Sequence, residues 1–281
     1  MSFGIVIPYH GERYRWTMNT VRNIHQCPFI DEIVINAEPG NGDSLRVKQA
    51  SDNYKNVRFM RNDLQLGPLK NKIESVRRCR SEWVVLVDSD NVLNKSYFPP
   101  QITNFQLCKD VIYCPESAMP KFDFKRFVGS DINFKSSVEM LGTPMFEVLL
   151  NDGNYLFHRK TWLDAMDSAE EFDPVAVDVL WANFNCLKRG MVMKVIPGMV
   201  YTHSIHQEST YLKTHDRSRA AAEEIKKKMR DEYENRRGAV GVPAETEVCV
   251  PGTSNFAASR GPGGRMVRQP SDSDPTELLT D

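Results

Sequence analysis

The chain has 281 residues, 41% of them hydrophobic, and its 36 basic and 37 acidic side chains leave a formal net charge of −1. This composition allows one large folded domain or two small ones, and the balanced charge argues against nucleic-acid binding. No apolar run approaches the ~20 residues of a membrane span, and no targeting segment is visible. The six cysteines show neither a C-x-x-C pair nor a zinc spacing. We therefore expect a cytoplasmic protein with reduced thiols and no membrane span.

The first hundred residues alternate apolar runs with segments of helical period. In chain order the expected elements are strand 3–7, helix 13–27, strand 32–35, helix 45–53, strand 57–60, helix 69–80 and strand 83–87. Asp43 or Ser44 is expected to cap the second helix, and Leu69, Ile73 and Val76 share one face of the third. This order predicts an α/β fold with a mostly parallel sheet and right-handed crossovers.

The second half of the chain has a less regular pattern. Its expected elements are strand 111–114, loops and a short helix in 117–148, strand 153–158, helix 160–166, helix 177–188, and strands 191–196 and 199–202 around a Pro197-Gly198 turn. A charged helix over 213–236 with a narrow apolar stripe should pack on this domain. From residue 238 onward Gly, Pro, Ser and Thr dominate, which predicts a disordered tail.

Two aspartates stand at the end of the fourth predicted strand. The run Trp83-Val84-Val85-Leu86-Val87 is typical of a strand buried on both faces, and Asp88-Ser89-Asp90 follows it directly. In open α/β sheets ligands bind outside the carboxyl ends of strands, so Asp88 and Asp90 can hold a divalent cation that in turn meets a diphosphate. The tripeptide recurs at Asp272-Ser273-Asp274 in the tail, but no strand precedes it there.

Polar residues follow other predicted strands and precede the third helix. Pro8, Tyr9, His10 and Arg13 come after the first strand, Asn36 and Glu38 after the second, and Lys70 lies near the start of the helix. Tyr9 can line a nucleobase, Arg13 or Lys70 can meet a phosphate, and Asn36 or Glu38 can accept a hydrogen bond from a base. By spacing alone, a surface loop, a turn and a solvated lysine explain the same residues equally well.

Two histidines and one acid complete the candidate set. His203 and His206 lie in one loop just after a predicted strand, and an imidazole can join two carboxylates around Mn²⁺ or Mg²⁺. Asp178 stands between apolar residues at the start of a helix, where a carboxylate either complements the helix dipole or faces a cleft as a base. Asp173, before Pro174, is its local rival.

Taken in order, these pieces resemble a glycosyltransferase of the GT-A fold, most similar to the large inverting family 2, over roughly residues 3–211. The resemblance is carried by Ile5-Val6-Ile7-Pro8-Tyr9-His10, Glu32-Ile33-Val34-Ile35-Asn36, Leu69-Lys70-Asn71-Lys72-Ile73, Val85-Leu86-Val87-Asp88-Ser89-Asp90, the segment Gly153–Trp162, Val177-Asp178-Val179-Leu180-Trp181, and His203 with His206. It departs from the family at Asn36-Ala37-Glu38-Pro39, where Asp-Asp-Gly-Ser is common, and at Val177, where an acid is usual.

The resemblance implies a Rossmann-like GT-A sheet flanked by helices. Residues 1–110 would be the nucleotide-sugar-binding half and 111–211 the acceptor-binding and catalytic half, followed by a C-terminal helix over 212–237 and a disordered tail over 238–281. Asp88, Ser89 and Asp90 would bind the donor nucleotide, with the loops at Pro8–His10 and Asn36–Glu38 and with Lys70. The metal would be held by Asp88, Asp90 and His206, with His203 as the close rival.

The expected reaction follows from the same resemblance. Asp178 would be the base that activates an acceptor hydroxyl, and Asn154, His158 and Trp162 would shape the acceptor side. We expect an inverting, Mn²⁺- or Mg²⁺-dependent transferase that uses a UDP- or GDP-type sugar donor and a glycan or glycoconjugate acceptor. The alternatives are a retaining GT-A transferase, a nucleotidyltransferase, or a non-catalytic sugar-nucleotide or carbohydrate-binding module.

Overall fold

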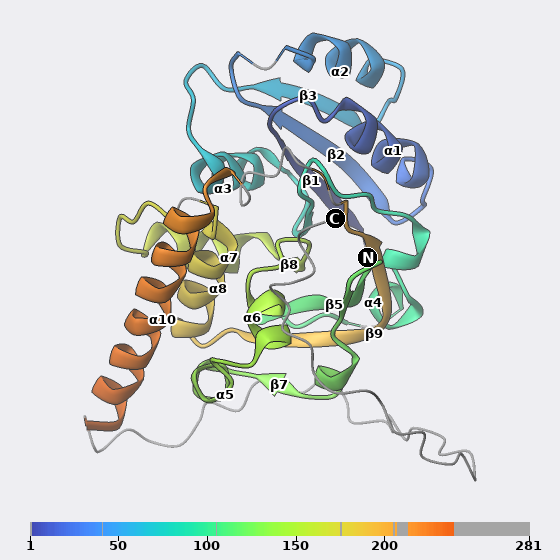
Figure 1. Ribbon diagram of the computed structural model, residues 1–281. Coiled ribbons are helices and arrows are strands. Elements are labelled where there is room, and N and C mark those ends of the chain that lie inside the picture. The colour runs from blue at the N-terminus through green and yellow to red at the C-terminus, as the bar shows by residue number, and fades with distance from the viewer. Residues whose placement is uncertain are drawn as a thin grey trace.

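The computed structural model describes residues 2–40, 42–104, 106–174, 176–204, 206 and 213–238. Within them a sheet of nine strands runs through both halves of the chain, in the order β3-β2-β1-β4-β8-β5-β9-β7, with β6 beside β5 (Figure 1). The strands are β1 (Phe3–Tyr9), β2 (Ile30–Ala37), β3 (Val57–Arg61), β4 (Trp83–Leu86), β5 (Val111–Met119), β6 (Phe122–Asp123), β7 (Asp131–Ile132), β8 (Leu156–His158) and β9 (Val192–Thr202).

The sheet is mostly parallel, as the sequence predicts. Strands β1, β2, β3 and β4 pair in parallel, and so do β5 and β9. Strand β8 is antiparallel to both β4 and β5. At the periphery, β6 pairs antiparallel with β5, and β7 pairs antiparallel with β9. Buried aliphatic side chains fill both faces of β1, β2 and β4, which explains their continuous apolar runs.

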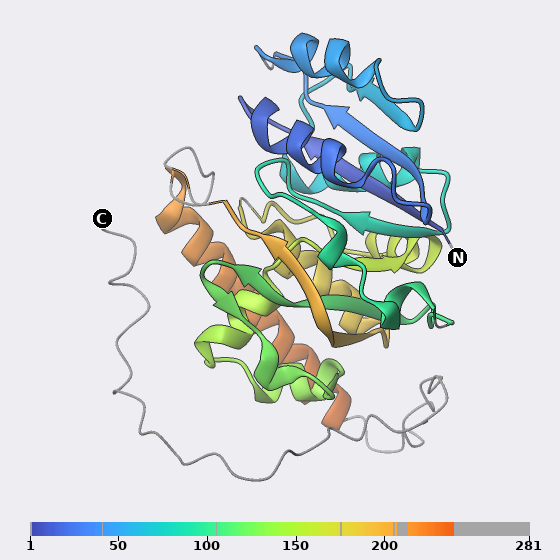
Figure 2. The same cartoon turned by 90° about the vertical axis from the view of Figure 1, so that its right-hand side faces the viewer.

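Helices cover both faces of this sheet. They are α1 (Tyr14–Ile24), α2 (Ser44–Ser51), α3 (Pro68–Arg78), α4 (Pro100–Thr103), α5 (Phe134–Glu139), α6 (Pro144–Leu150), α7 (Arg159–Asp167), α8 (Asp178–Lys188) and α10 (His215–Gly238), with 3-10 turns η1 (Lys95–Tyr97) and η2 (Lys125–Phe127). Figure 2 shows α1 and α2 on one face, whereas α3 lies on the other with α7 and α8. Right-handed crossovers that change direction after β3 require this arrangement.

The order of the strands reverses between β1 and β4. From β1 the chain moves outward through β2 to β3, and then α3 returns it to the opposite side of β1, where β4 lies. Ligands of open α/β sheets bind at such a switch point, outside the carboxyl ends of the strands. The fold therefore places the residues that follow β1 and β4 at one edge of the sheet.

Three local expectations were wrong. The two strands expected around Pro197-Gly198 form one continuous strand, β9, which accommodates the turn residues as an irregularity opposite β5, with Gly198 at φ 76°. The segment 117–148 contains two short helices and two short strands, which its mixed composition did not indicate. Asp43 occupies the N-cap position of α2 but makes no cap bond, because its carboxylate bonds Tyr9 and Tyr14 instead.

The long C-terminal helix packs against α5 and α8 (Figure 1). Ala221, Ile225 and Met229 form its buried stripe, and Tyr233 is partly buried, as the period of the sequence predicts. None of the described helices combines the length and apolar character that a bilayer crossing requires. The tail expected from residue 238 lies outside the described residues apart from Gly238, which ends the helix.

Candidate active site

The segment after β4 lies beside the end of β1. The Val87 N–H donates to the Val6 carbonyl, so the chain leaves the sheet next to the end of β1. Ser89 is then held between the two segments. Its hydroxyl accepts from the His10 N–H at 3.4 Å, and its carbonyl accepts from the Thr17 hydroxyl at 3.0 Å. The Asp-Ser-Asp segment is therefore fixed through its central serine, with an aspartate on either side.

Asp90 contacts two groups that the sequence singled out. Its Oδ2 lies 3.1 Å from the Arg13 guanidinium and 2.9 Å from His206 Nε2. Burial raises the pKa of Asp90, but the contact with His206 and the charge of Arg13 outweigh it and hold the pKa below its usual value. Asp90 is therefore an anion at neutral pH, with an arginine on one side and an imidazole on the other.

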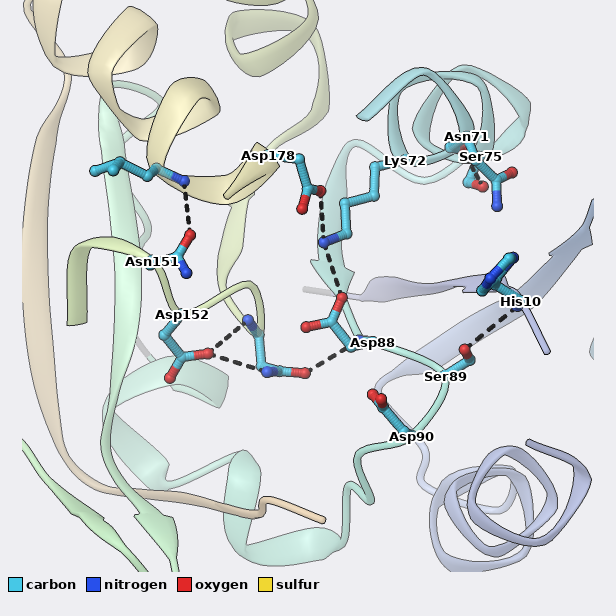
Figure 3. A network of polar contacts seen from close by, with 12 residues as sticks. His10, Asn71, Lys72, Ser75, Asp88, Ser89, Asp90, Asn151, Asp152 and Asp178 are labelled. Carbon is cyan, nitrogen blue, oxygen red and sulfur yellow. Dashed lines mark hydrogen bonds and ion pairs between the residues drawn. The ribbon is translucent and has the colours of Figure 1, made fainter. Parts of the chain in front are cut away.

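Asp88 belongs to a different cluster, with Lys72 and Asp178 (Figure 3). The ammonium of Lys72, which reaches in from α3, lies 2.9 Å from Asp88 Oδ1 and 2.8 Å from Asp178 Oδ2. Burial alone would lower the pKa of Lys72, but the two carboxylates reverse this and raise it. Lys72 is thus a cation that joins the end of β4 to the first turn of α8.

A buried loop before β8 holds the backbone of Asp88 through hydrogen bonds. The Asp88 N–H donates to Asn154 Oδ1, and Asn154 in turn donates through its backbone and side-chain nitrogens to Asp152 Oδ1, both at 3.0 Å (Figure 3). The Tyr201 hydroxyl donates to the same oxygen at 3.1 Å. Burial raises the pKa of Asp152 to about 6. A Cβ on Gly153 would lie 3.0 Å from Asp88 Oδ2 and 2.9 Å from a Val179 methyl, so the close approach of this loop requires glycine.

Comparisons with known proteins bear on this arrangement. The model of the family described as glycosyl transferase family 2 matches residues 5–150, a little more than half of the chain, and the match includes β1, α3 and the Asp-Ser-Asp segment. The chain belongs to glycosyl transferase family 2. No curated protein matches it by sequence.

Solved structures show the same fold. A crystal structure of S. aureus TarS residues 1–349 has a TM-score of 0.53 at 12% identity, covering 86% of this chain and 73% of that one. The same TarS fragment in complex with UDP-GlcNAc gives 0.58 at 12%, covering 84% and 67%, and its complex with UDP gives 0.54 at 11%, covering 84% and 72%. The predicted fold class is confirmed: this family 2 glycosyltransferase has a GT-A-like α/β sheet flanked by helices.

The described residues of this family 2 glycosyltransferase provide only some of the ligands that the implied metal ion would need. Among the described residues no three His, Cys, Asp or Glu side chains lie close enough together to hold a metal ion. Asp90 Oδ2 and His206 Nε2 are 2.9 Å apart, close to the separation of about 3 Å between neighbouring ligands of an octahedral ion. A carboxylate and an imidazole suit Mn²⁺, so this pair fits two positions of a shell that the diphosphate and water would complete.

The two histidines of the late loop differ in their surroundings. The segment after Asp90 pairs with the end of β9 through Val92 and Thr202, and this brings His206 to Asp90. His203 packs its ring edge-on against Phe122 and Tyr201 instead. Burial lowers the pKa of His203. Of the two candidate ligands, only His206 contacts an aspartate of the Asp-Ser-Asp segment.

The side chains expected to surround the nucleobase are largely committed to other contacts. The Tyr9 hydroxyl donates to Asp43, and the fully buried Asn36 amide donates to Asn62 at 3.1 Å and to Asn71 at 2.9 Å. Glu38 is also buried; it accepts from the Leu66 N–H at 2.9 Å, and burial raises its pKa. Pro8 is buried in β1, whereas His10 is exposed. These residues do lie at the carboxyl edge, as strand order required.

The lysine that enters the site is not the one expected from the sequence. Lys70 is exposed, and its ammonium lies 3.5 Å from Glu171. Lys72, two residues further along α3, makes the contacts with Asp88 and Asp178. The amphipathic pattern of α3 concealed it, because a lysine among apolar residues is normally a solvated one.

Two of the three residues expected on the acceptor side are not brought to this edge. Asn154 contacts Asp88, but β8 runs antiparallel to β4, so His158 pairs with Trp83 at the opposite edge of the sheet. There the His158 ring lies 2.8 Å from the Thr161 hydroxyl and caps α7. Trp162 is buried and stacks on Phe157. Because β8 runs antiparallel to β4, His158 and Trp162 lie away from the edge where we expected them to shape the acceptor side.

Proposed function

We propose that this enzyme transfers a sugar from a nucleotide-diphosphate sugar to an acceptor hydroxyl, with inversion at the anomeric carbon. The observation that carries the proposal is the division of the Asp-Ser-Asp segment. Asp90 lies beside the guanidinium of Arg13 and the imidazole of His206, which are suited to a metal-bound diphosphate. Asp88 instead shares the ammonium of Lys72 with Asp178, a buried carboxylate at the start of α8.

The donor would bind at the carboxyl ends of β1, β2 and β4. Asp90 and His206 would hold a divalent cation, Mn²⁺ or Mg²⁺, which when bound neutralises the charge that develops on the leaving diphosphate. Arg13, 3.1 Å from Asp90, would contact a diphosphate oxygen. The nucleobase of the donor would lie against the segments that contain Tyr9 and Glu38. The TarS complexes contain UDP-GlcNAc and UDP, which supports testing uridine donors first and guanosine donors next.

Asp178 would act as the general base. Its carboxylate takes the proton of the acceptor hydroxyl while the hydroxyl oxygen attacks the anomeric carbon, and the electron pair of the breaking bond leaves with the diphosphate. The rival Asp173 is exposed, 3.8 Å from Arg217. Asp178 contacts Lys72, which also contacts Asp88, and this supports its assignment. Asn154 is the remaining candidate on the acceptor side.

A screen of nucleotide sugars tests the proposal. Release of the nucleoside diphosphate is measured for UDP- and GDP-linked sugars, with Mn²⁺, with Mg²⁺ and with EDTA. Turnover of one donor class that EDTA abolishes is the expected result. Turnover of none, with or without a panel of glycan and glycoconjugate acceptors, contradicts the proposal.

Two substitutions then test the base and the stereochemistry. Asp178→Asn should lower transfer by about 10²–10⁴-fold, the usual contribution of a positioned base, while donor affinity is retained. Asp173→Asn is the matched control and should transfer normally. NMR of the product identifies its anomeric configuration, and retention would replace the inverting mechanism by that of a retaining transferase.

A further inference from the structure

Lys72 is the only described residue whose charged group contacts both Asp88 and Asp178. Asp88 follows β4 and is part of the donor edge, whereas Asp178 begins α8, which the chain reaches only after 90 further residues. The side chains of Lys72 and Asp178 are 10% and 7% exposed. The Asp88 side chain is 28% exposed, so two of the three charges are largely removed from water, where ion-pair geometry has large energetic consequences.

The cluster is unusual in having two anions and one cation. Two ionised carboxylates that lie close together repel each other, and a cation between them offsets this repulsion. Figure 3 shows the ammonium of Lys72 in this place, with one carboxylate on either side. Removal of that ammonium would leave Asp178 without the contact that sets the direction of its carboxylate toward Asp88.

The backbone around Lys72 is itself fixed. Ser75, one turn further along α3, is buried and donates to the Asn71 carbonyl, and Asn71 accepts from Asn36 and Asn62, both at 2.9 Å. These contacts tie the buried face of α3 to β2. Lys72 thus extends from a rigid part of the donor half, so its ammonium has a defined position relative to the ends of β1 and β4.

We propose that Lys72 is a positioning residue of the transfer reaction, whose ammonium holds the carboxylate of Asp178 in register with the donor edge at Asp88. This inference rests on the proposed function, in which Asp178 is the base. Misplacement of a reacting group by about 1 Å can cost on the order of 10²-fold in rate. The role of Lys72 is therefore to align the base with the acceptor hydroxyl that attacks the anomeric carbon, and the ammonium itself exchanges no proton.

A double-mutant cycle tests this role. The rate constant of transfer, the KM for donor and the melting temperature are measured for Lys72→Met, Asp178→Asn and the double variant. Lys72→Met should lower kcat by about 10²-fold with a much smaller change in donor KM, and it should have almost no further effect when Asp178 is already Asn. Lys72→Arg should restore part of kcat, because a guanidinium can also contact two carboxylates.

Lys226 provides a matched control. Its ammonium also lies between two carboxylates, 2.6 Å from Glu147 and 2.9 Å from Glu223, but on α10 away from the donor edge. Lys226→Met should lower the melting temperature and leave kcat unchanged. If Lys72→Met behaves like Lys226→Met, or lowers kcat by the same factor in both backgrounds, the positioning role is wrong.

The outcomes also separate this inference from the proposed function. Loss of transfer in Asp178→Asn with normal transfer in Lys72→Met overturns the inference alone. Normal transfer in Asp178→Asn overturns the assigned base, and with it the reason for positioning that residue. If Lys72→Met does not fold, Lys72→Arg measured in the two backgrounds gives the same comparison, and additive effects again overturn the inference.

Discussion

His206 Nε2 lies 2.9 Å from Asp90 Oδ2, although 116 residues separate the two in the chain. The contact depends on the pairing of Val92 with Thr202, which brings the end of β9 beside the segment after β4. Trp16 holds the imidazole from another side, with ring centroids 5.1 Å apart. Strand pairing and the contact with Trp16 thus position the late histidine beside Asp90.

Replacement of His206 should weaken metal-dependent nucleotide binding. His206→Ala removes the imidazole beside Asp90, and we expect the affinity for UDP in Mn²⁺ to fall by about 10-fold or more, the usual effect of disturbing a metal shell, with a small change in melting temperature. His203→Ala is the informative comparison, since its ring packs on Phe122 and Tyr201 and its loss should act mainly on stability. Equal, unchanged metal dependence in both variants would mean that the loop has only a structural role.

Glycine at position 153 is expected to be required for donor binding. In Gly153→Ala the new methyl would stand 3.0 Å from Asp88 Oδ2 and 2.9 Å from Val179 Cγ2, so Asp88 or its loop must move. We expect donor affinity to fall by about 10-fold, measured by titration with the nucleotide. Gly238→Ala, where nothing lies within 4 Å of the added carbon, should leave affinity unchanged. Normal binding in Gly153→Ala would show that the position of Asp88 is unimportant.

The buried carboxyl of Asp152 should make stability depend on pH. Burial raises its pKa from 3.8 to about 6, so between these values the folded state binds more protons than the unfolded state, and stability falls as pH rises through this window. Asp152→Asn removes this pH-dependent loss of stability, and its side-chain oxygen can still accept from the backbone and side-chain nitrogens of Asn154. Denaturant unfolding should therefore show the variant gaining on the order of 2–3 kcal/mol over the natural protein between pH 4 and pH 7. Parallel pH profiles would contradict this.

Periodicity was sufficient to predict the strands and helices in the first half of the chain. The run Trp83–Val87 and the β-branched residues of β1 and β2 predict buried parallel strands, and the structure has them within a few residues of the expected bounds. Prediction was poorest in residues 117–148, where elements are held by tertiary contacts and are too short to show a period. The Pro197-Gly198 pair has the chemistry of a turn, but β5 alongside keeps the strand continuous.

The sequence singled out candidate site residues where an acidic side chain borders an apolar segment. Asp88, Asp90 and Asp178 were singled out by their position after or before an apolar segment, and the structure brings all three to one edge. Lys72 was missed because its partners lie far along the chain, so that nothing local distinguishes it from the exposed Lys70. His158 was misplaced because the direction of β8 in the sheet is not encoded in its own pattern.

Calorimetry with UDP and GDP tests most directly whether a nucleoside diphosphate binds beside Asp90 through a divalent cation. Titrations are made with Mn²⁺ and with EDTA, on the natural protein, on Asp90→Asn, and on Asp272→Asn, which changes the second Asp-Ser-Asp outside the described residues. We predict binding of one nucleotide in Mn²⁺ that is lost in EDTA and in Asp90→Asn but kept in Asp272→Asn. Equal affinity in EDTA, or in Asp90→Asn, would contradict it.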